Sequence, residues 1–142
     1  MSTVKNLLEI KGQTVHSISP DSSVYDALEV LEEKNLGALV VIDKGKLIGV
    51  FTERDYARKV VLKGRSSKET LVADIMSDRP IFVNPHTSIE DCMQLMTDKF
   101  VRHLPVIENN QVIGVISIGD IVKYIIDEKE YIIENLRHYI SS

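Results

Sequence analysis

Two short segments of this chain each combine a glycine, two apolar residues, a hydroxyl residue and, three positions later, an aspartate. They are Gly49-Val-Phe-Thr-Glu-Arg-Asp55 and Gly114-Val-Ile-Ser-Ile-Gly-Asp120. Where a strand leads into a helix, the hydroxyl and the first free amides would face a phosphate, because helix N-termini favour anions. A carboxylate one turn into the helix can accept two hydrogen bonds from a ribose diol. The candidate nucleotide contacts are therefore Thr52, Asp55, Ser117 and Asp120.

The same spacing is also typical of helix capping. Thr52 with Asp55, or Ser117 with Asp120, resembles a capping box in which aspartate takes the place of glutamate. The duplication does not separate these two interpretations, because a cap would be duplicated as readily as a binding site.

A basic pair, Arg102 and His103, stands directly before an apolar segment. An arginine can bind phosphate oxygens through its planar fork, and a histidine can donate to them in a pH-dependent way. The alternative is a surface pair that only solvates a loop. Arg54, inside the first motif, is a further candidate for a contact with phosphate or with a second subunit.

These residues belong to an internal repeat. Shifted by 65 positions, the stretch from Pro20 to Asp55 aligns without a gap with the stretch from Pro85 to Asp120, and 11 of the 36 positions are identical. Gly37 and Ala38 then stand opposite Arg102 and His103, and they would leave room for a base or for the approach of backbone. The two sites are therefore expected to differ.

Each copy is predicted to contain the elements β-α-β-β-α. A β-rich segment leads into an amphipathic helix, for which Ser23 and Ser88 are the expected N-caps. Two apolar strands joined by a polar turn follow, and a second helix begins near Thr52 or Ser117. The expected strands are 14–18, 38–42 and 47–51 in the first copy, and 81–83, 104–107 and 112–116 in the second.

The predicted fold class is α/β (α+β). The expected domains are residues 4–64 and 71–127, with a helical extension at 128–142. One unit of this size would bury too little surface to be stable alone, so the two copies are expected to pack sheet to sheet with pseudo-two-fold symmetry.

Taken together, these features resemble the tandem CBS domain pair, or Bateman module, of stand-alone CBS domain-containing proteins. The features are the duplicated β-α-β-β-α order, the Gly-to-Asp motifs, the strand Pro105-Val106-Ile107 and the lead-in Asp74-Ile75-Met76. The resemblance covers residues 4 to about 126. It implies clefts between the two copies that bind AMP, ADP, ATP, NAD or S-adenosylmethionine.

The resemblance also implies roles for individual residues. The two motif aspartates would bind ribose and the two motif hydroxyls would bind phosphate. Adenine would lie in the apolar part of a cleft near Val15, Leu39 or Val83, held by main-chain hydrogen bonds. The full set of predicted ligand-binding residues is Val15, Ala38, Leu39, Thr52, Arg54, Asp55, Val83, Arg102, His103, Leu104, Pro105, Ser117 and Asp120.

The expected function is that of a non-catalytic regulatory module. Nucleotide occupancy would change the arrangement of the two copies, and an unidentified client protein would respond. The alternative is a regulator of a redox or metabolic enzyme that binds its partner without an obligatory nucleotide. No common catalytic motif occurs in the sequence, and neither a catalytic cofactor nor a metal site is expected. Cys92 is interpreted as a small buried packing residue.

Composition points to an ordinary globular protein. The net charge of −4 argues against nucleic-acid binding, and no apolar run reaches the roughly 18 to 20 residues that span a membrane. A cytoplasmic location is expected. Near the C-terminus, apolar residues recur with helical spacing to about Ile140, beyond the end of the first copy's helix. This surplus apolar surface predicts a homodimer; a tail that folds back on its own monomer is the alternative.

Overall fold

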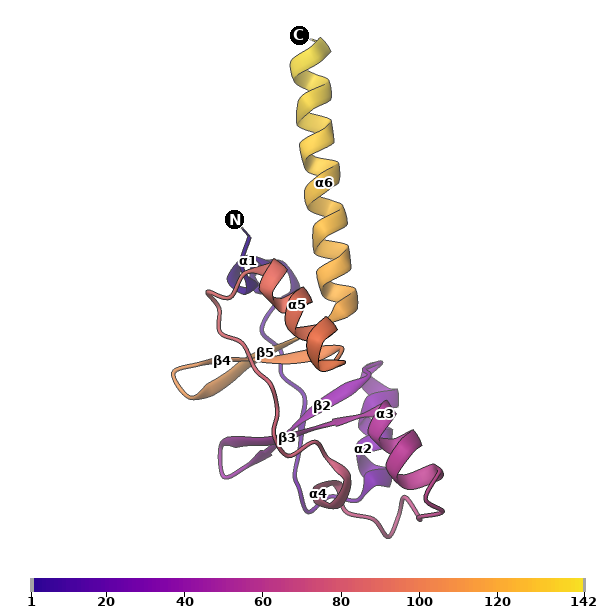
Figure 1. Cartoon of the computed structure of the whole chain (residues 1–142). Coiled ribbons are helices and arrows are strands. Elements are labelled where there is room, and N and C mark those ends of the chain that lie inside the picture. The colour runs from indigo at the N-terminus through magenta and orange to yellow at the C-terminus, as the bar shows by residue number, and fades with distance from the viewer. Residues whose placement is uncertain (1, 142) are drawn as a thin grey trace.

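Two small α/β units make up the body of the molecule, and one long helix projects from it (Figure 1). The computed structural model describes residues 2–141. The first half of the chain contains α1 (Val4–Lys11), β1 (Ser17–Ile18), α2 (Val24–Lys34), β2 (Ala38–Asp43), β3 (Lys46–Thr52), α3 (Glu53–Tyr56) and the π-helical segment η1 (Ala57–Val61). The second half contains α4 (Val72–Ile75), α5 (Ile89–Lys99), β4 (His103–Glu108), β5 (Gln111–Ser117) and α6 (Ile118–Ser141).

The two sheets repeat one another in register. In the first sheet, β1 pairs in parallel with β2, which pairs antiparallel with β3. In the second, β4 and β5 form the antiparallel pair, and a parallel bridge from Val83 to Val106 stands where β1 pairs Ile18 with Val41. Both hairpins carry an irregularity after the same position, Val41 or Val106. The predicted mixed α/β fold and its duplication are confirmed.

Both hairpins turn through residues with positive φ. Lys44 and Gly45 have φ of 51° and 78°, and Asn109 and Asn110 have φ of 53° and 62°. Two consecutive positive φ values are the signature of the type I′ turn, whose twist matches that of the flanking strands. The polar turns predicted between the strands therefore fix the register of each hairpin.

Helices α2 and α5 begin at the expected serines. The Ser23 hydroxyl accepts a hydrogen bond from the amide of Asp26 at 3.1 Å, and the Ser88 hydroxyl accepts one from the amide of Asp91 at 3.0 Å. Cys92 is fully buried on α5, and burial raises the pKa of its thiol to about 11, with a smaller contribution from the neighbouring carboxylates. It is therefore a packing residue, as predicted.

The two lead-in helices are exchanged between the repeats. α4 follows the first repeat and packs on it, but α1, which precedes the first repeat, packs on the second. The backbone contacts are equivalent: the amide of Val72 donates to the Ser22 carbonyl, and the amide of Val4 donates to the Thr87 carbonyl, both at 2.9 Å. The buried side chains of α1, namely Val4, Leu7 and Leu8, therefore belong to the second core.

Two glycines make this exchange possible. A Cβ on Gly49 would lie 2.6 Å from the Met76 sulfur, and a Cβ on Gly114 would lie 2.9 Å from a methyl carbon of Leu8. Each glycine thus lets the end of a lead-in helix lie directly against the hairpin. Close packing against the lead-in helices therefore explains why both repeats have a glycine at this position.

Both faces of each hairpin are covered. Leu39 and Val41 point into the core of the first unit, while Val40, which alternates to the opposite face, is also buried. β3 and β5 contact each other across the space between the sheets. This is the sheet-to-sheet packing expected from the small size of each unit.

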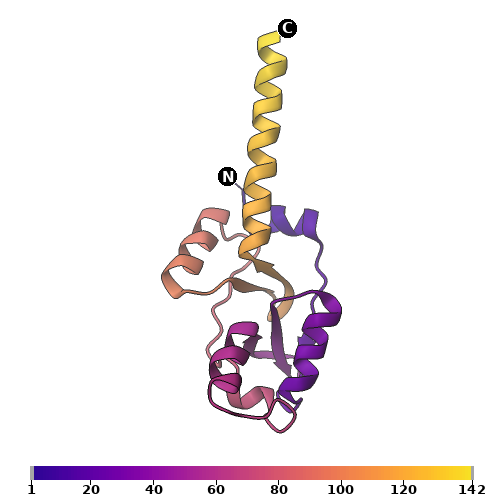
Figure 2. The same cartoon turned by 90° about the vertical axis from the view of Figure 1, so that its right-hand side faces the viewer.

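The helix α6 is anchored at one end only. Its first turns contact α1 and α5, and Ile121 is fully buried in the second core. Beyond them the helix extends away from the body, as two perpendicular views show (Figures 1 and 2). It does not fold back on its own chain. Among residues 2–141, no helix is long and apolar enough to cross a membrane.

Candidate functional site

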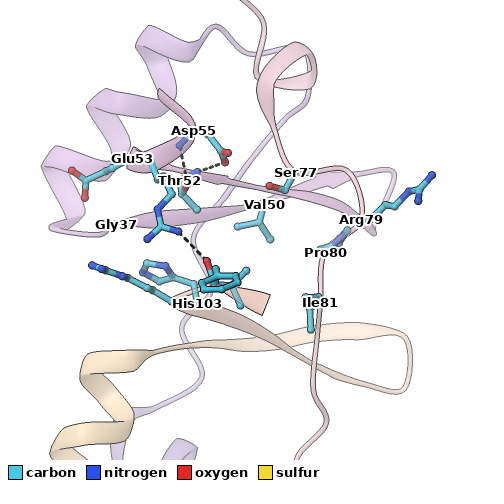
Figure 3. A pocket seen from close by; sticks show the side chains of 14 residues that line it. Gly37, Val50, Thr52, Glu53, Asp55, Ser77, Arg79, Pro80, Ile81 and His103 are labelled. Carbon is cyan, nitrogen blue, oxygen red and sulfur yellow. Dashed lines mark hydrogen bonds between the residues drawn. The ribbon is translucent and has the colours of Figure 1, made fainter. Parts of the chain in front are cut away.

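The first pocket lies between the two repeats and has a volume of about 360 Å³. One wall comes from the β3–α3 junction of the first repeat, and the other comes from the chain before β4 and from the connection after α4. Figure 3 shows Thr52 and Asp55 on the first wall and His103 on the second. The lining residues are Gly37, Val50, Thr52, Glu53, Arg54, Asp55, Ser77, Arg79, Pro80, Ile81, Phe100, Val101, Arg102 and His103.

Thr52 and Asp55 form a complete capping box. The amide of Asp55 donates to the Thr52 hydroxyl and the amide of Thr52 donates to Asp55 Oδ2, both at 3.0 Å. The other carboxylate oxygen, Oδ1, lies 3.2 Å from the Lys59 ammonium, one turn further along the chain. Both oxygens of Asp55 therefore have partners, and the capping interpretation is correct in the first repeat.

The second pocket, of about 340 Å³, is built around the equivalent junction of the second repeat. The amide of Ser117 donates to Asp120 Oδ2 at 2.8 Å, and the amide of Asp120 donates to the Ser117 hydroxyl at 3.1 Å. The Lys11 ammonium lies 2.6 Å from the same Oδ2. The lining residues are Lys11, Thr14, His16, Asn35, Leu36, Gly37, Ala38, His103, Val115, Ser117 and Asp120.

Lys11 controls the charge of this second pocket. Burial raises the pKa of Asp120, but hydrogen bonds from Lys11 and Ser117 and the attraction of the Lys11 charge outweigh it, so the pKa falls below its usual range. Asp120 is therefore held as a carboxylate. Lys11 also donates to the carbonyl of Val115, so two groups of the β5–α6 junction hold it.

His103 separates the two pockets and lines both. Its imidazole occupies the space that Gly37 leaves open: a Cβ on Gly37 would lie 3.3 Å from the ring. The room expected beside Gly37 is thus filled by His103 in this structure. Burial lowers the pKa of His103, and Lys11 and Arg102 lower it further, while Asp120 opposes them.

The two predicted arginines lie on opposite walls of the first pocket. Arg54 Nη1 donates to the carbonyl of Phe100 at 2.9 Å, and this hydrogen bond joins the first repeat to the second. Arg102 lies on the second wall with an exposed side chain. The binding of phosphate by Arg54 and Arg102 stays a prediction.

The structure brings most of the predicted site residues together but leaves out five. Thr52, Arg54, Asp55, Arg102 and His103 surround the first pocket, and Ala38, His103, Ser117 and Asp120 surround the second. Five others line neither pocket: Val15, Leu39, Val83, Leu104 and Pro105.

The physical reason is strand alternation and burial. Leu39, Val83 and Leu104 point into the two hydrophobic cores, and Pro105 is buried on the opposite face of β4. Val15 is half-buried in the segment before β1. The adenine contact predicted near Leu39 and Val83 is one through the main chain, and it stays a prediction, because only the side chains of these residues are placed in the cores.

Sequence reasoning missed two cations, Lys11 and Arg79. Lys11 is the last residue of α1 and Arg79 lies shortly after the end of α4, and each lines one of the two pockets. Unlike Lys11, the Arg79 side chain is directed away from its pocket in Figure 3. A shift of 68, three more than the shift of the main repeat, aligns Lys11 with Arg79 and Leu8 with Met76. This second alignment is the feature of the sequence that could have identified Lys11 and Arg79 as an equivalent pair.

Comparison with known proteins adds independent information. The family model for the CBS domain matches residues 9–62 and 72–127. The mitochondrial CBS domain-containing protein CBSX3 of Arabidopsis thaliana is 40% identical over 148 residues, which cover 98% of this chain and 72% of that protein.

Solved structures agree. A CBS domain of known crystal structure is 46% identical and has a TM-score of 0.85, with 88% of this chain and 98% of that chain covered. The crystal structure of CBSX2 in complex with AMP is 29% identical and has a TM-score of 0.74, with 91% of this chain and 99% of that chain covered.

Proposed function

The chain belongs to the CBS-domain family, and from this premise we propose that it is a regulatory module that binds an adenine nucleotide between its two repeats. The observation that carries the proposal is the pair of pockets between the repeats. Each is lined by one hydroxyl-to-aspartate motif and by cationic side chains. The AMP complex of the structurally similar CBSX2 supports the choice of ligand class.

In the first pocket, the ribose binds Asp55 and the phosphate binds beside Thr52. The carboxylate can accept from a ribose hydroxyl if Lys59 releases Oδ1, an exchange made easier by the partial exposure of that lysine. Arg54, Arg102 and His103 supply donors for phosphate oxygens from both walls. A nucleotide bound in this way touches both repeats and stabilises one arrangement of them over others, which is the requirement for a ligand-driven change.

The second pocket binds the same class of ligand. Lys11 and the Ser117 amide both contact Asp120 Oδ2, so the proposed acceptor for a ribose hydroxyl is the other oxygen, Oδ1. In the first pocket, Lys59 contacts Asp55 Oδ1, the oxygen that the ribose needs. Each lysine also donates to a main-chain carbonyl, that of Val115 or Ile75. AMP, ADP, ATP and NAD all remain proposals as the natural ligand, because the pocket residues do not distinguish among them.

The test is a calorimetric titration of AMP, ADP, ATP and NAD into the wild type, Asp55→Asn and Asp120→Asn. Asparagine keeps one oxygen that can accept from the Thr52 or Ser117 amide, so the helix cap survives while a charged ribose acceptor is lost. We expect Asp55→Asn to weaken binding to the first pocket about tenfold or more, since a hydrogen bond to a charged group contributes about 1.5–3 kcal/mol.

Asp26→Asn is the matched control, because Asp26 occupies the same place in α2, outside both pockets. It is expected to bind like the wild type. If the wild type binds none of the four nucleotides more tightly than millimolar, the proposed function is wrong.

We also propose that two copies associate through α6. This helix presents partly or largely exposed apolar residues on one face, and its outer part projects away from the body of the chain (Figure 2). They are Val122, Ile126, Ile133, Leu136 and Ile140. Burial of this face against the same face of a second copy would remove apolar surface from water and place the pockets of two modules in one assembly.

The alternative is that a client protein covers this face and that nucleotide is not required. A regulator of a redox or metabolic enzyme would fit this description. If Asp55→Asn combined with Asp120→Asn left client binding and its response to nucleotide unchanged, the alternative would be preferred. A cytoplasmic location stays a prediction, and the Arabidopsis relative is described as mitochondrial.

A further inference from the structure

Phe100 has an unusual backbone conformation at the end of α5. Its φ and ψ are 55° and 38°, in the left-handed region, where it forms the C-cap of the helix. Glycine and asparagine are the residues that normally occupy this position, and a bulky side chain there is disfavoured. The equivalent residue at the end of α2 is Asn35, with φ and ψ of 54° and 56°. The second repeat therefore carries a phenylalanine where the first carries an ordinary cap residue.

The Phe100 side chain also gains little from burial. It is 80% exposed, yet it lines the first pocket. An exposed phenylalanine alone needs no explanation, since apolar atoms form much of any protein surface. An exposed phenylalanine in a disfavoured backbone conformation at the rim of a pocket does need one, because neither the fold nor the helix end benefits from the ring.

The backbone of Phe100 is fixed from two sides. Its amide donates to the Met96 carbonyl at the end of α5, and its carbonyl accepts from Arg54 at 2.9 Å. Arg54 comes from the opposite wall, beside Thr52 and Asp55. The backbone that carries the Phe100 ring is therefore held in place by α5 on one side and by Arg54 on the other.

We propose that Phe100 is the residue of the first pocket that binds the base of the nucleotide, by stacking its ring on that base. The inference rests on the proposed function and deepens it. Thr52 and Asp55 hold the phosphate and ribose, and the ring covers the base. Aromatic rings stack on every base, with an energy that corresponds to a roughly tenfold gain in affinity or more. The second pocket has Asn35 at this place.

The test compares Phe100→Asn with the wild type, both in the Asp120→Asn background so that binding to the second pocket is suppressed. We expect AMP binding to weaken about tenfold, while binding of ribose 5-phosphate, which has no base, stays unchanged. We also expect the melting temperature to stay equal or to rise, because asparagine suits the left-handed cap. A drop in binding therefore does not arise from unfolding.

Two further variants complete the design. Phe82→Asn removes another exposed phenylalanine, which lines neither pocket, and is expected to bind AMP normally. Phe100→Trp is expected to keep AMP affinity, and because the chain contains no tryptophan, its fluorescence reports on this site alone. We expect AMP to quench it and ribose 5-phosphate to leave it unchanged.

The results separate a failure of the stacking role from a failure of the proposed function. If Phe100→Asn binds AMP as tightly as its parent, or loses AMP and ribose 5-phosphate to the same extent, the stacking role is wrong while the proposed function stands. If the parent binds neither compound, the proposed function fails and the stacking role fails with it.

Discussion

The two motif aspartates are each paired with a lysine, but the two lysines come from different parts of the chain. Lys59 follows Asp55 by four positions on the same helical segment, whereas Lys11 reaches Asp120 from the exchanged helix α1. The first pair is local in sequence, and Lys59 also donates to the carbonyl of Ile75 in α4. The second depends on the packing of the N-terminal segment on the second repeat, so the state of the second pocket reports on that packing.

His103 is the residue most sensitive to pH between the pockets. Its pKa is below its ordinary value of 6.5, chiefly through burial, with Lys11 and Arg102 acting in the same direction and Asp120 against them. The folded protein therefore binds a proton at this site less readily than the unfolded chain. The stabilising contribution is present above about pH 6.5 and decreases as the pH falls toward the lowered pKa.

We therefore predict that the free energy of unfolding of the wild type decreases between pH 7.5 and pH 5.5, and that His103→Gln reduces this decrease. Urea denaturation at the two pH values measures it. His86→Gln, at an exposed histidine far from both pockets, is the control and should follow the wild type. An identical pH dependence in His103→Gln and the wild type would contradict the assignment.

At the scale of elements, substitution of Gly49 and Gly114 should reveal how closely the lead-in helices pack against the hairpins. A methyl group on Gly49 would meet both the Met76 sulfur at 2.6 Å and the carbonyl oxygen of Ser77 at 2.8 Å. A methyl group on Gly114 would meet only the Leu8 side chain, at 2.9 Å, and a side chain can move more easily than backbone.

We predict that Gly49→Ala destabilises the protein by about 1–3 kcal/mol and that Gly114→Ala costs clearly less, because overpacking against backbone is harder to relieve. Thermal and urea denaturation of the two variants measure the difference. Gly119→Ala, where a Cβ would have only ordinary contacts, serves as the control. Equal losses at Gly49 and Gly114 would show that the carbonyl of Ser77 is not the obstacle.

The elements that the sequence predicts well are those set by local patterns. The serine caps of α2 and α5, the hairpins and both capping boxes follow from spacings of a few residues, and all are present. On α5, Cys92 is fully buried as predicted, and the next residue, Met93, is 38% exposed. Neighbouring residues of a helix point in directions about 100° apart, so two in a row cannot both face the centre of the core.

The features that the sequence does not reveal depend on the path of the chain. The exchange of α1 onto the second repeat places Lys11 beside Asp120, 109 positions away. Strand alternation gives two faces but not which one borders a pocket, so the sequence does not show that the side chains of Leu39 and Leu104 lie in the cores. The Arg54 contact with the Phe100 carbonyl likewise requires the relative placement of the repeats.

For the whole molecule, the exposed face of α6 predicts the oligomeric state. Ile133 and Leu136 are 48% and 55% exposed on the projecting part of the helix. We predict that Ile133→Glu combined with Leu136→Glu converts a dimer into a monomer, because two charges would have to be buried without partners. Light scattering coupled to size-exclusion chromatography measures the mass.

Tyr131→Glu is the matched control, because it adds a charge on the opposite side of the same helix. It is expected to leave the dimer intact, and the double variant is expected to keep its nucleotide affinity, since α6 beyond its first turn lines neither pocket. If the wild type is monomeric across the micromolar range, the proposal that a second copy covers this face is wrong.

The exchanged lead-in helices also determine what can be inherited or transplanted. A gene segment that begins at residue 72 would encode the second repeat without Val4, Leu7 and Leu8, which fill its core. The first repeat would likewise lack Val72 and Ile75 if its segment ended before α4. Recombination that splits the chain between the repeats therefore leaves two incomplete interiors. The smallest piece that can be moved intact into another protein is the pair.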